Sequence, residues 1–161
     1  MNPAVGILMG SDSDMDQLKP CAEVLREFGV SYDARVLSAH RTPDETVAFA
    51  KEAAGKGMKV LIAAAGGAAH LAGVVAAYTQ LPVIGVPIDT PSFGGLDSLL
   101  STVQMPAGTP VATVAVGPGG VRNAAYFALR ILALQDAKLA EALRDHKEKT
   151  RRRILDKKIS L

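Results

Sequence analysis

Short apolar runs alternate along the chain with segments of helical periodicity. Four runs are rich in Val, Ile and Ala and lie next to Gly or Pro: Ala4–Met9, Lys59–Ala65, Pro82–Val86 and Val111–Val116. Continuous apolarity is typical of parallel strands that are covered on both faces. A fifth candidate, Val30–Val36, alternates apolar and polar residues, which indicates a strand nearer the edge of a sheet.

Helical patterns fill the gaps between these runs. Met15–Phe28 places apolar side chains at spacings of three and four residues. Because an interior proline costs about 3 kcal/mol, Pro20 predicts a bend or a later helix start. A second helix is predicted over Pro43–Lys56, with Thr42 and Glu45 in the spacing of a capping box.

After the GPG of residues 117–119, one long helical pattern covers Val121–Leu143. Ala and Leu occupy much of its surface, and a helix that is apolar over so wide a face needs a partner. That partner is either a second subunit or, for the first half of the pattern, the chain's own sheet.

The alternation of strands and helices predicts an α/β fold. We expect a doubly wound parallel sheet of the flavodoxin or Rossmann type, with right-handed crossovers and a long C-terminal helix. A chain of 161 residues corresponds to one domain. The expected organisation is a single α/β domain over residues 1–143 and a basic helical tail over residues 144–161.

The basic character of the chain belongs to this tail. Residues 144–158 contain eight Lys or Arg and three Asp or Glu, within a total net charge of +2, so the rest of the chain is net acidic. A solvated helix end is the simpler interpretation, and nucleic-acid binding is the alternative. Aromatic residues make up 4% of the chain and Trp is absent, which disfavours recognition of nucleic acid by base stacking.

Composition disfavours several other classes of site. Cys21 is the single cysteine and lies on an apolar helix face, so we expect it in the core rather than in a disulfide or a multi-cysteine metal site. No carboxylates recur near the histidines at ligand spacing, which disfavours a metal. No Gly-x-Ser-x-Gly elbow is present. Neither a signal peptide nor a spanning segment is recognisable, so we expect a cytoplasmic protein.

Polar and ionisable residues collect directly after four of the predicted strands. Parallel sheets bind ligands beyond the carboxyl ends of their strands, where the strand order reverses. The four segments are GSDSD at 10–14, SAHRTP at 38–43, GGAAHL at 66–71 and DTPSFGG at 89–95.

The segment at 38–43 is the strongest candidate. Arg41, next to a predicted helix start, would grip a phosphate with its forked guanidinium. An imidazole titrates near neutral pH, so His40 would give or accept a proton. A solvated loop is the simpler alternative.

Two other segments each have two interpretations. Residues 10–14 form either a capping turn or a ribose site, in which Asp14 suits hydroxyl groups better than phosphate. Neither a P-loop nor a GxGxxG pattern is present. Gly66 and Gly67 allow either a flat ligand to approach the backbone or close helix–sheet packing, with His70 at a helix start.

Four segments together resemble the signatures of the PurE family of purine biosynthesis, colinearly over about residues 4–140: MGSDSD at 9–14, SAHRTP at 38–43, AGGAAHL at 65–71 and VQMPAG at 103–108. One branch of that family carries SAHRTP and AGGAAHL and moves a carboxylate from N5 to C4 of N5-carboxyaminoimidazole ribonucleotide. The other typically has SAHKT and an AGRSNALSG-like segment, and carboxylates aminoimidazole ribonucleotide directly with CO2. The chain resembles the first, mutase branch.

The resemblance implies that His40 is the general acid/base. It also implies a substrate-binding set: Ser11 and Asp14 for the ribonucleotide, Ser38 and Arg41 for the 5′-phosphate, and Gly66, Gly67 and His70 for the imidazole and carboxylate. It implies a homo-octamer whose sites are completed by neighbouring subunits, and no metal, biotin or ATP as cofactor at this step. No role is carried over to residues 89–95.

Three alternatives to an isomerase stay open at this point. Direct carboxylation of aminoimidazole ribonucleotide would use the same scaffold. A non-catalytic nucleotide-binding module would need the cavity but not the proton chemistry of His40. Binding of nucleic acid through the Arg151–Arg153 run would need only the tail.

Overall fold

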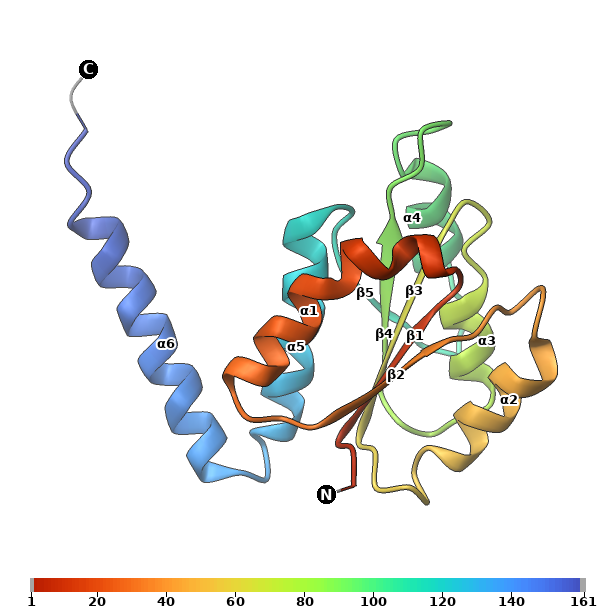
Figure 1. The fold of residues 1–161 in the computed structure, drawn as a ribbon, viewed down its shortest axis with the longest axis horizontal. Coiled ribbons are helices and arrows are strands. Elements are labelled where there is room, and N and C mark those ends of the chain that lie inside the picture. The colour runs from red at the N-terminus through yellow and green to blue at the C-terminus, as the bar shows by residue number, and fades with distance from the viewer. Residues whose placement is uncertain (1, 160–161) are drawn as a thin grey trace.

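The computed structural model describes residues 2–159 and contains a five-stranded parallel sheet with the order β2-β1-β3-β4-β5 (Figure 1). The strands are β1 Val5–Met9, β2 Tyr32–Val36, β3 Val60–Gly66, β4 Val83–Ile88 and β5 Ala112–Thr113. The helices are α1 Met15–Glu27, α2 Pro43–Glu52, α3 Leu71–Ala77, α4 Leu96–Val103, α5 Pro118–Leu132 and α6 Ala137–Leu155, with a 3-10 turn, η1, at Asp12–Asp14.

The sheet is doubly wound, as predicted. From β1 the chain moves outward to β2 and then returns across β1 to β3, so the strand order reverses between β1 and β3. Helices α1 and α5 cover one face, and α2, α3 and α4 cover the other (Figure 1). This arrangement is the flavodoxin-like α/β fold, and it puts the carboxyl ends of β1, β2 and β3 side by side at the switch point.

Aliphatic side chains fill the core on both faces of the sheet. On one side, Val121, Ala125 and Leu129 of α5 pack with Leu25 of α1 against the central strands, all almost fully buried. On the other side, Phe49 of α2 joins a second buried cluster with α3 residues. Cys21 is buried in the first cluster, in agreement with its prediction as a core residue.

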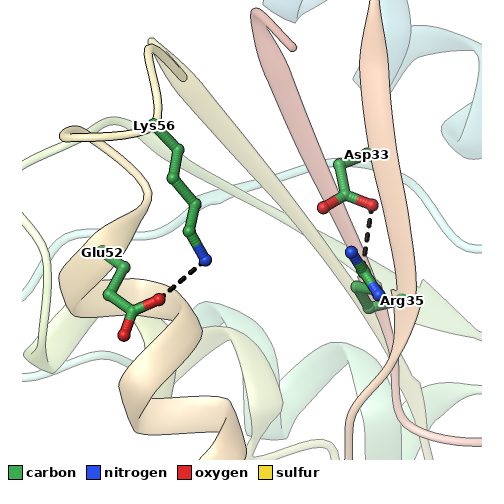
Figure 2. A network of polar contacts seen from close by, with 4 residues as sticks. All are labelled: Asp33, Arg35, Glu52 and Lys56. Atoms are coloured by element: carbon green, nitrogen blue, oxygen red, sulfur yellow. Dashed lines mark hydrogen bonds and ion pairs between the residues drawn. The ribbon is translucent and has the colours of Figure 1, made fainter. Parts of the chain in front are cut away.

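The edge strand β2 differs from the buried strands by its polar surface. Asp33 and Arg35 form an ion pair of 2.9 Å along it, and Glu52 and Lys56, at the end of α2, form another of 2.7 Å (Figure 2). Exposed pairs of this kind contribute little to stability. Charges on an edge strand do, however, oppose pairing with a strand from another molecule.

Several local predictions were wrong. Thr42 does not form a capping box, because its hydroxyl bonds back to the backbone of Ser38 instead of capping α2. Helix α2 ends at Glu52 rather than Lys56. Helix α1 spans Met15–Glu27, one residue short of its prediction, and runs through Pro20, so of the two outcomes predicted for this proline the later helix start is excluded. Strand β5 is only two residues long.

The predicted long pattern over 121–143 is divided between two helices. Helix α5 ends at Leu132, and the carboxylate of Asp136 accepts the backbone N–H of Leu139 at 3.0 Å, which caps a new helix. The first half of α6 contacts the body, since Leu139 and Leu143 pack against the first core cluster and His146 lies 3.0 Å from the Tyr126 hydroxyl, whereas the C-terminal end of α6 extends away from the sheet (Figure 1). Among the described residues, no helix has both the length and the apolarity that crossing a membrane requires.

Candidate active site

A cavity of about 550 Å³ opens at the switch point, beyond the carboxyl ends of β1 to β4. The structure brings all eight predicted site residues together in its lining: Ser11, Asp14, Ser38, His40, Arg41, Gly66, Gly67 and His70. They come from three loops that are far apart in the sequence. Their roles stay predictions, but their convergence in one cavity is a property of the fold.

Ser38 organises the loop after β2. Its side chain is buried, and its Oγ accepts the backbone N–H groups of His40 at 3.4 Å and Arg41 at 3.2 Å. Thr42 closes the loop from the other end, because its Oγ1 accepts the backbone N–H of Ser38 at 2.8 Å and its own N–H reaches the Ser38 carbonyl at 2.9 Å. The three residues between Ser38 and Thr42, His40 and Arg41 among them, are thereby held in one conformation.

Arg41 spans two of the loops. Its Nη2 donates to the carbonyl oxygen of Gly10, after β1, and its Nε donates to Ser38 Oγ at 3.4 Å. The remaining N–H donors of an exposed guanidinium suit the oxygens of a phosphate, which an arginine fork binds in two places at once.

His40 and His70 are in direct contact across the cavity. His40 Nε2 lies 2.8 Å from His70 Nδ1, and the two rings meet edge-on with centroids 4.9 Å apart and an interplanar angle of 80°. Sequence analysis assigned separate roles to these residues, thirty positions apart, and did not predict that they would bond.

The loop after β1 contains a cluster of short polar side chains. Ser13 Oγ donates to Ser11 Oγ at 2.8 Å, and the Ser13 hydroxyl lies 3.3 Å from Asp14 Oδ1. Asp14 itself is buried, and burial raises the pKa of its carboxyl, against the lowering effects of its hydrogen bonds with Ser13 and Ser11. A carboxylate in this position is a natural acceptor for hydroxyl donors of a ligand.

The two glycines at the carboxyl end of β3, Gly66 as its last residue and Gly67 directly after it, are favoured for different reasons. A Cβ on Gly66 would lie 2.8 Å from the Thr90 methyl group, so the Thr90 side chain would have to move to admit any larger residue there. Gly67 has φ +62°, a left-handed conformation that glycine adopts without strain. Thr90 also lines the cavity, although sequence analysis gave it no role. Its place two residues beyond the end of β4, within the polar segment 89–95, was the available signal.

The fourth sequence motif has a packing role in this structure. Met105 follows α4 and packs against Gly73 of α3. A Cβ atom added to Gly73 would lie 3.1 Å from the Met105 sulfur. Within residues 2–159, the cavity lining includes no residue of 103–108, and no three His, Cys, Asp or Glu side chains gather as metal ligands.

Comparisons of sequence and of structure with known proteins identify the same family. A family model described as AIR carboxylase matches residues 4–153. N5-carboxyaminoimidazole ribonucleotide mutase of Thermotoga maritima is 51% identical over 96% of this chain and 90% of its own, and the Saccharolobus solfataricus protein of the same name is 50% identical over 98% of both. The crystal structure of Treponema denticola PurE superposes with a TM-score of 0.85 at 33% identity, covering 96% of this chain and 95% of that one.

Proposed function

The chain belongs to the AIR carboxylase family, and on this premise we propose that it converts N5-carboxyaminoimidazole ribonucleotide into 4-carboxy-5-aminoimidazole ribonucleotide. It is an isomerase of purine biosynthesis. The proposal rests on one observation above all: His40 and Arg41 share a cavity at the switch point, in a chain about half identical to mutases over almost its whole length.

The reaction moves one carboxyl group and leaves the proton count unchanged. The N5–carboxyl bond breaks, CO2 departs, and N5 takes a proton to become an amine. The nucleophilic C4 carbon then attacks the same CO2, forming a C–C bond. Loss of the C4 proton restores the aromatic ring. One group that gives a proton and later takes one back is sufficient, and His40 is the imidazole placed to do this.

The rest of the cavity binds the ribonucleotide. Arg41 is placed to hold the 5′-phosphate together with Ser38, whose hydroxyl proton remains available as a donor while its oxygen accepts backbone N–H groups. Asp14 and Ser11, on the neighbouring loop, face the ribose hydroxyls in this arrangement. Phosphate and ribose are thus fixed at two ends, which orients the imidazole ring between them.

Small residues around the ring site suit the retention of CO2. Gly66, Gly67 and Ala68 line the cavity without long or charged side chains, so a flat ring packs against backbone and water is displaced. Holding the released CO2 next to C4 gives the second step the advantage of proximity. The residues require no cofactor for this chemistry.

We include a homo-octamer in the proposal. Leu96, Leu100 and Val103 form an exposed apolar stripe on α4, and Leu134, between α5 and α6, is 84% exposed. Surfaces of this kind are typical of protein contacts. Mass photometry of the full chain should give eight subunits, and Leu100→Asp should shift the distribution to smaller species. A monomeric wild type would contradict the octamer.

The proposal places the enzyme in the cytoplasm without a nucleic-acid partner. Part of the positive charge of α6 is already neutralised, since Arg151 and Arg152 both pair with Glu148, at 3.1 and 3.0 Å. Removal of residues 147–161 should therefore not change retention on immobilised nucleic acid at low salt. Tight, salt-sensitive retention that this deletion abolishes would contradict the expectation.

Two parallel assays test the function. Purified protein receives N5-carboxyaminoimidazole ribonucleotide in one, and aminoimidazole ribonucleotide with bicarbonate in the other. We expect efficient turnover only in the first. Efficient turnover confined to the second would identify a carboxylase, and binding without turnover in either would identify a nucleotide-binding module.

A further inference from the structure

The contact between the two cavity histidines assigns a specific task to each ring. We propose that His70 is a positioning residue: its Nδ1 accepts the Nε2 proton of His40, so that Nδ1 of His40 is the only atom that exchanges protons with the substrate. This inference rests on the proposed function for its chemical meaning, but its structural content can be measured without substrate.

The geometry leaves one proton between the rings. At 2.8 Å, His40 Nε2 and His70 Nδ1 form a hydrogen bond in which one nitrogen donates and the other accepts. Nε2 of His40 is thereby occupied by a protein partner. For the substrate, only Nδ1 of His40 remains.

The direction of the bond follows from the chemistry. If His70 donated, neutral His40 would carry its own proton on Nδ1 and could not accept one from C4. If His70 accepts, neutral His40 keeps a proton on Nε2 and has a lone pair on Nδ1, as a base requires. After Nδ1 takes the C4 proton, His40 becomes a cation that gives this proton to N5 in the next cycle, and the Nε2 proton never moves.

Both rings are supported by constrained loops, as a lasting contact requires. The His40 loop is fixed by the reciprocal bonds between Ser38 and Thr42. The His70 loop turns at Gly67, is anchored by Ala69, which is 1% exposed, and closes with a bond of 2.8 Å from the His70 N–H to the Ala68 carbonyl. The rings therefore meet because each loop has little freedom to place them elsewhere.

This task differs from the substrate-binding role that the resemblance implies for His70. A group that only contacts the substrate carboxylate changes substrate affinity when it is removed and leaves His40 unaltered. A group that fixes the tautomer of His40 changes the state of another side chain in the free enzyme. It acts on turnover rather than on affinity, as the aspartate of serine-protease triads does for its histidine.

Nitrogen NMR of histidine-labelled full-length protein tests the inference in the absence of substrate. Resonances of His40 are assigned with His40→Asn, and spectra are recorded above the pH range in which the imidazoles protonate. We expect neutral His40 to carry its proton on Nε2 in the wild type and to become a mixture of both tautomers in His70→Ala. A wild-type proton on Nδ1, or no change in His70→Ala, would overturn the proposal.

A kinetic series provides the second readout. His70→Ala should lower kcat at least about tenfold with little change in KM, whereas His70→Asn, whose amide oxygen takes the place of Nδ1 as acceptor, should recover a substantial part of kcat. A rise in KM alone, equal in both variants, would identify a substrate contact instead. If the wild type shows no isomerase activity, the proposed function fails, and the NMR result still decides how the two rings bond.

Discussion

The backbone of Gly120, in the first turn of α5, lies directly against the carbonyl group of Ala115, and no space remains there for a Cβ atom. Gly119, its neighbour in the same turn, has open space at its Cβ position. The two positions therefore form a matched pair in which only one glycine is sterically required.

Gly120→Ala should lower the free energy of unfolding by about 3 kcal/mol, the upper end of the usual cost of overpacking, because the obstructing atoms are backbone and cannot move aside as a side chain would. Gly119→Ala should leave it unchanged or raise it by up to about 1 kcal/mol, since alanine favours helix. Denaturant titration of both variants measures the difference. Equal stabilities would show that the 115–120 turn is not rigid.

His40→Asn should abolish turnover, with a loss of at least about 100-fold, because asparagine cannot exchange the proton. Nucleotide binding should persist, since the Arg41 and Ser38 contacts do not involve the imidazole of His40. Calorimetry with the product ribonucleotide and a turnover assay on the same sample separate the two effects. Full activity in this variant would exclude His40 as the acid/base.

Arg41→Ala should mainly weaken nucleotide binding. Loss of a charged hydrogen-bond partner costs about 1.5–3 kcal/mol, which corresponds to a rise in Kd of roughly tenfold to 150-fold. Arg35→Ala is the control, because Arg35 pairs with Asp33 on the outer edge of the sheet (Figure 2). An unchanged Kd in Arg41→Ala would contradict the phosphate role.

Asp14→Asn should weaken ribonucleotide binding and, at neutral pH, raise the stability of the fold. Burial raises the pKa of Asp14 in the folded protein, so its ionised form destabilises the fold at pH values above that pKa, and this penalty disappears as the pH falls to the ordinary range of a carboxyl. The variant should be more stable than the wild type at neutral pH, and the two melting temperatures should converge in acid. At neutral pH its affinity for the ribonucleotide should fall. A stability difference that grows on acidification would have the wrong sign.

Cys21 should be unreactive in the folded protein. Burial raises the pKa of its thiol to about 12, and only the thiolate is the reactive species. Thiol reagents at pH 8 should label the native protein very slowly and the protein in guanidinium chloride at once. Rapid labelling under native conditions would show that the α1 face opens readily.

Apolar runs were sufficient to predict the sheet. Strands β1, β3 and β4 are continuous buried segments, and each begins or ends within two residues of its prediction. Their pattern is strong because both faces of a parallel sheet exclude water. Strand β5 was predicted too long because Val114–Val116 is apolar, yet pairing with β4 extends only over Ala112 and Thr113.

The wrong predictions of helix ends were concentrated at side chains that have two possible hydrogen-bond partners. Thr42 has the right identity and spacing for a cap, but the Ser38 backbone competes for its hydroxyl. The break before α6 depends on Asp136 as an N-cap, a signal that the surrounding Ala and Leu residues concealed. Local patterns do not contain the tertiary contact that decides such cases.

The same limit applies to the site. The convergence of its residues in one cavity was predictable, because polar and ionisable residues directly after strands are exceptional in so apolar a chain and the sheet topology brings the strand ends together. The bond from His40 to His70 was not predictable, since it depends on the relative position of two loops. Thr90 was missed because a single threonine after a strand has no distinctive chemistry.

Apart from Thr90, every residue that lines the cavity comes from positions 10–71, yet α5, near the other end of the chain, covers one face of the sheet that presents them. The first half of the polypeptide therefore contains nearly all of the reactive groups but lacks α5, the helix that covers one face of its central strands. A product of interrupted translation would expose that strand to aggregation and gain no activity. Conversely, a fragment ending near residue 110 should recover activity when a separately expressed C-terminal fragment supplies α5.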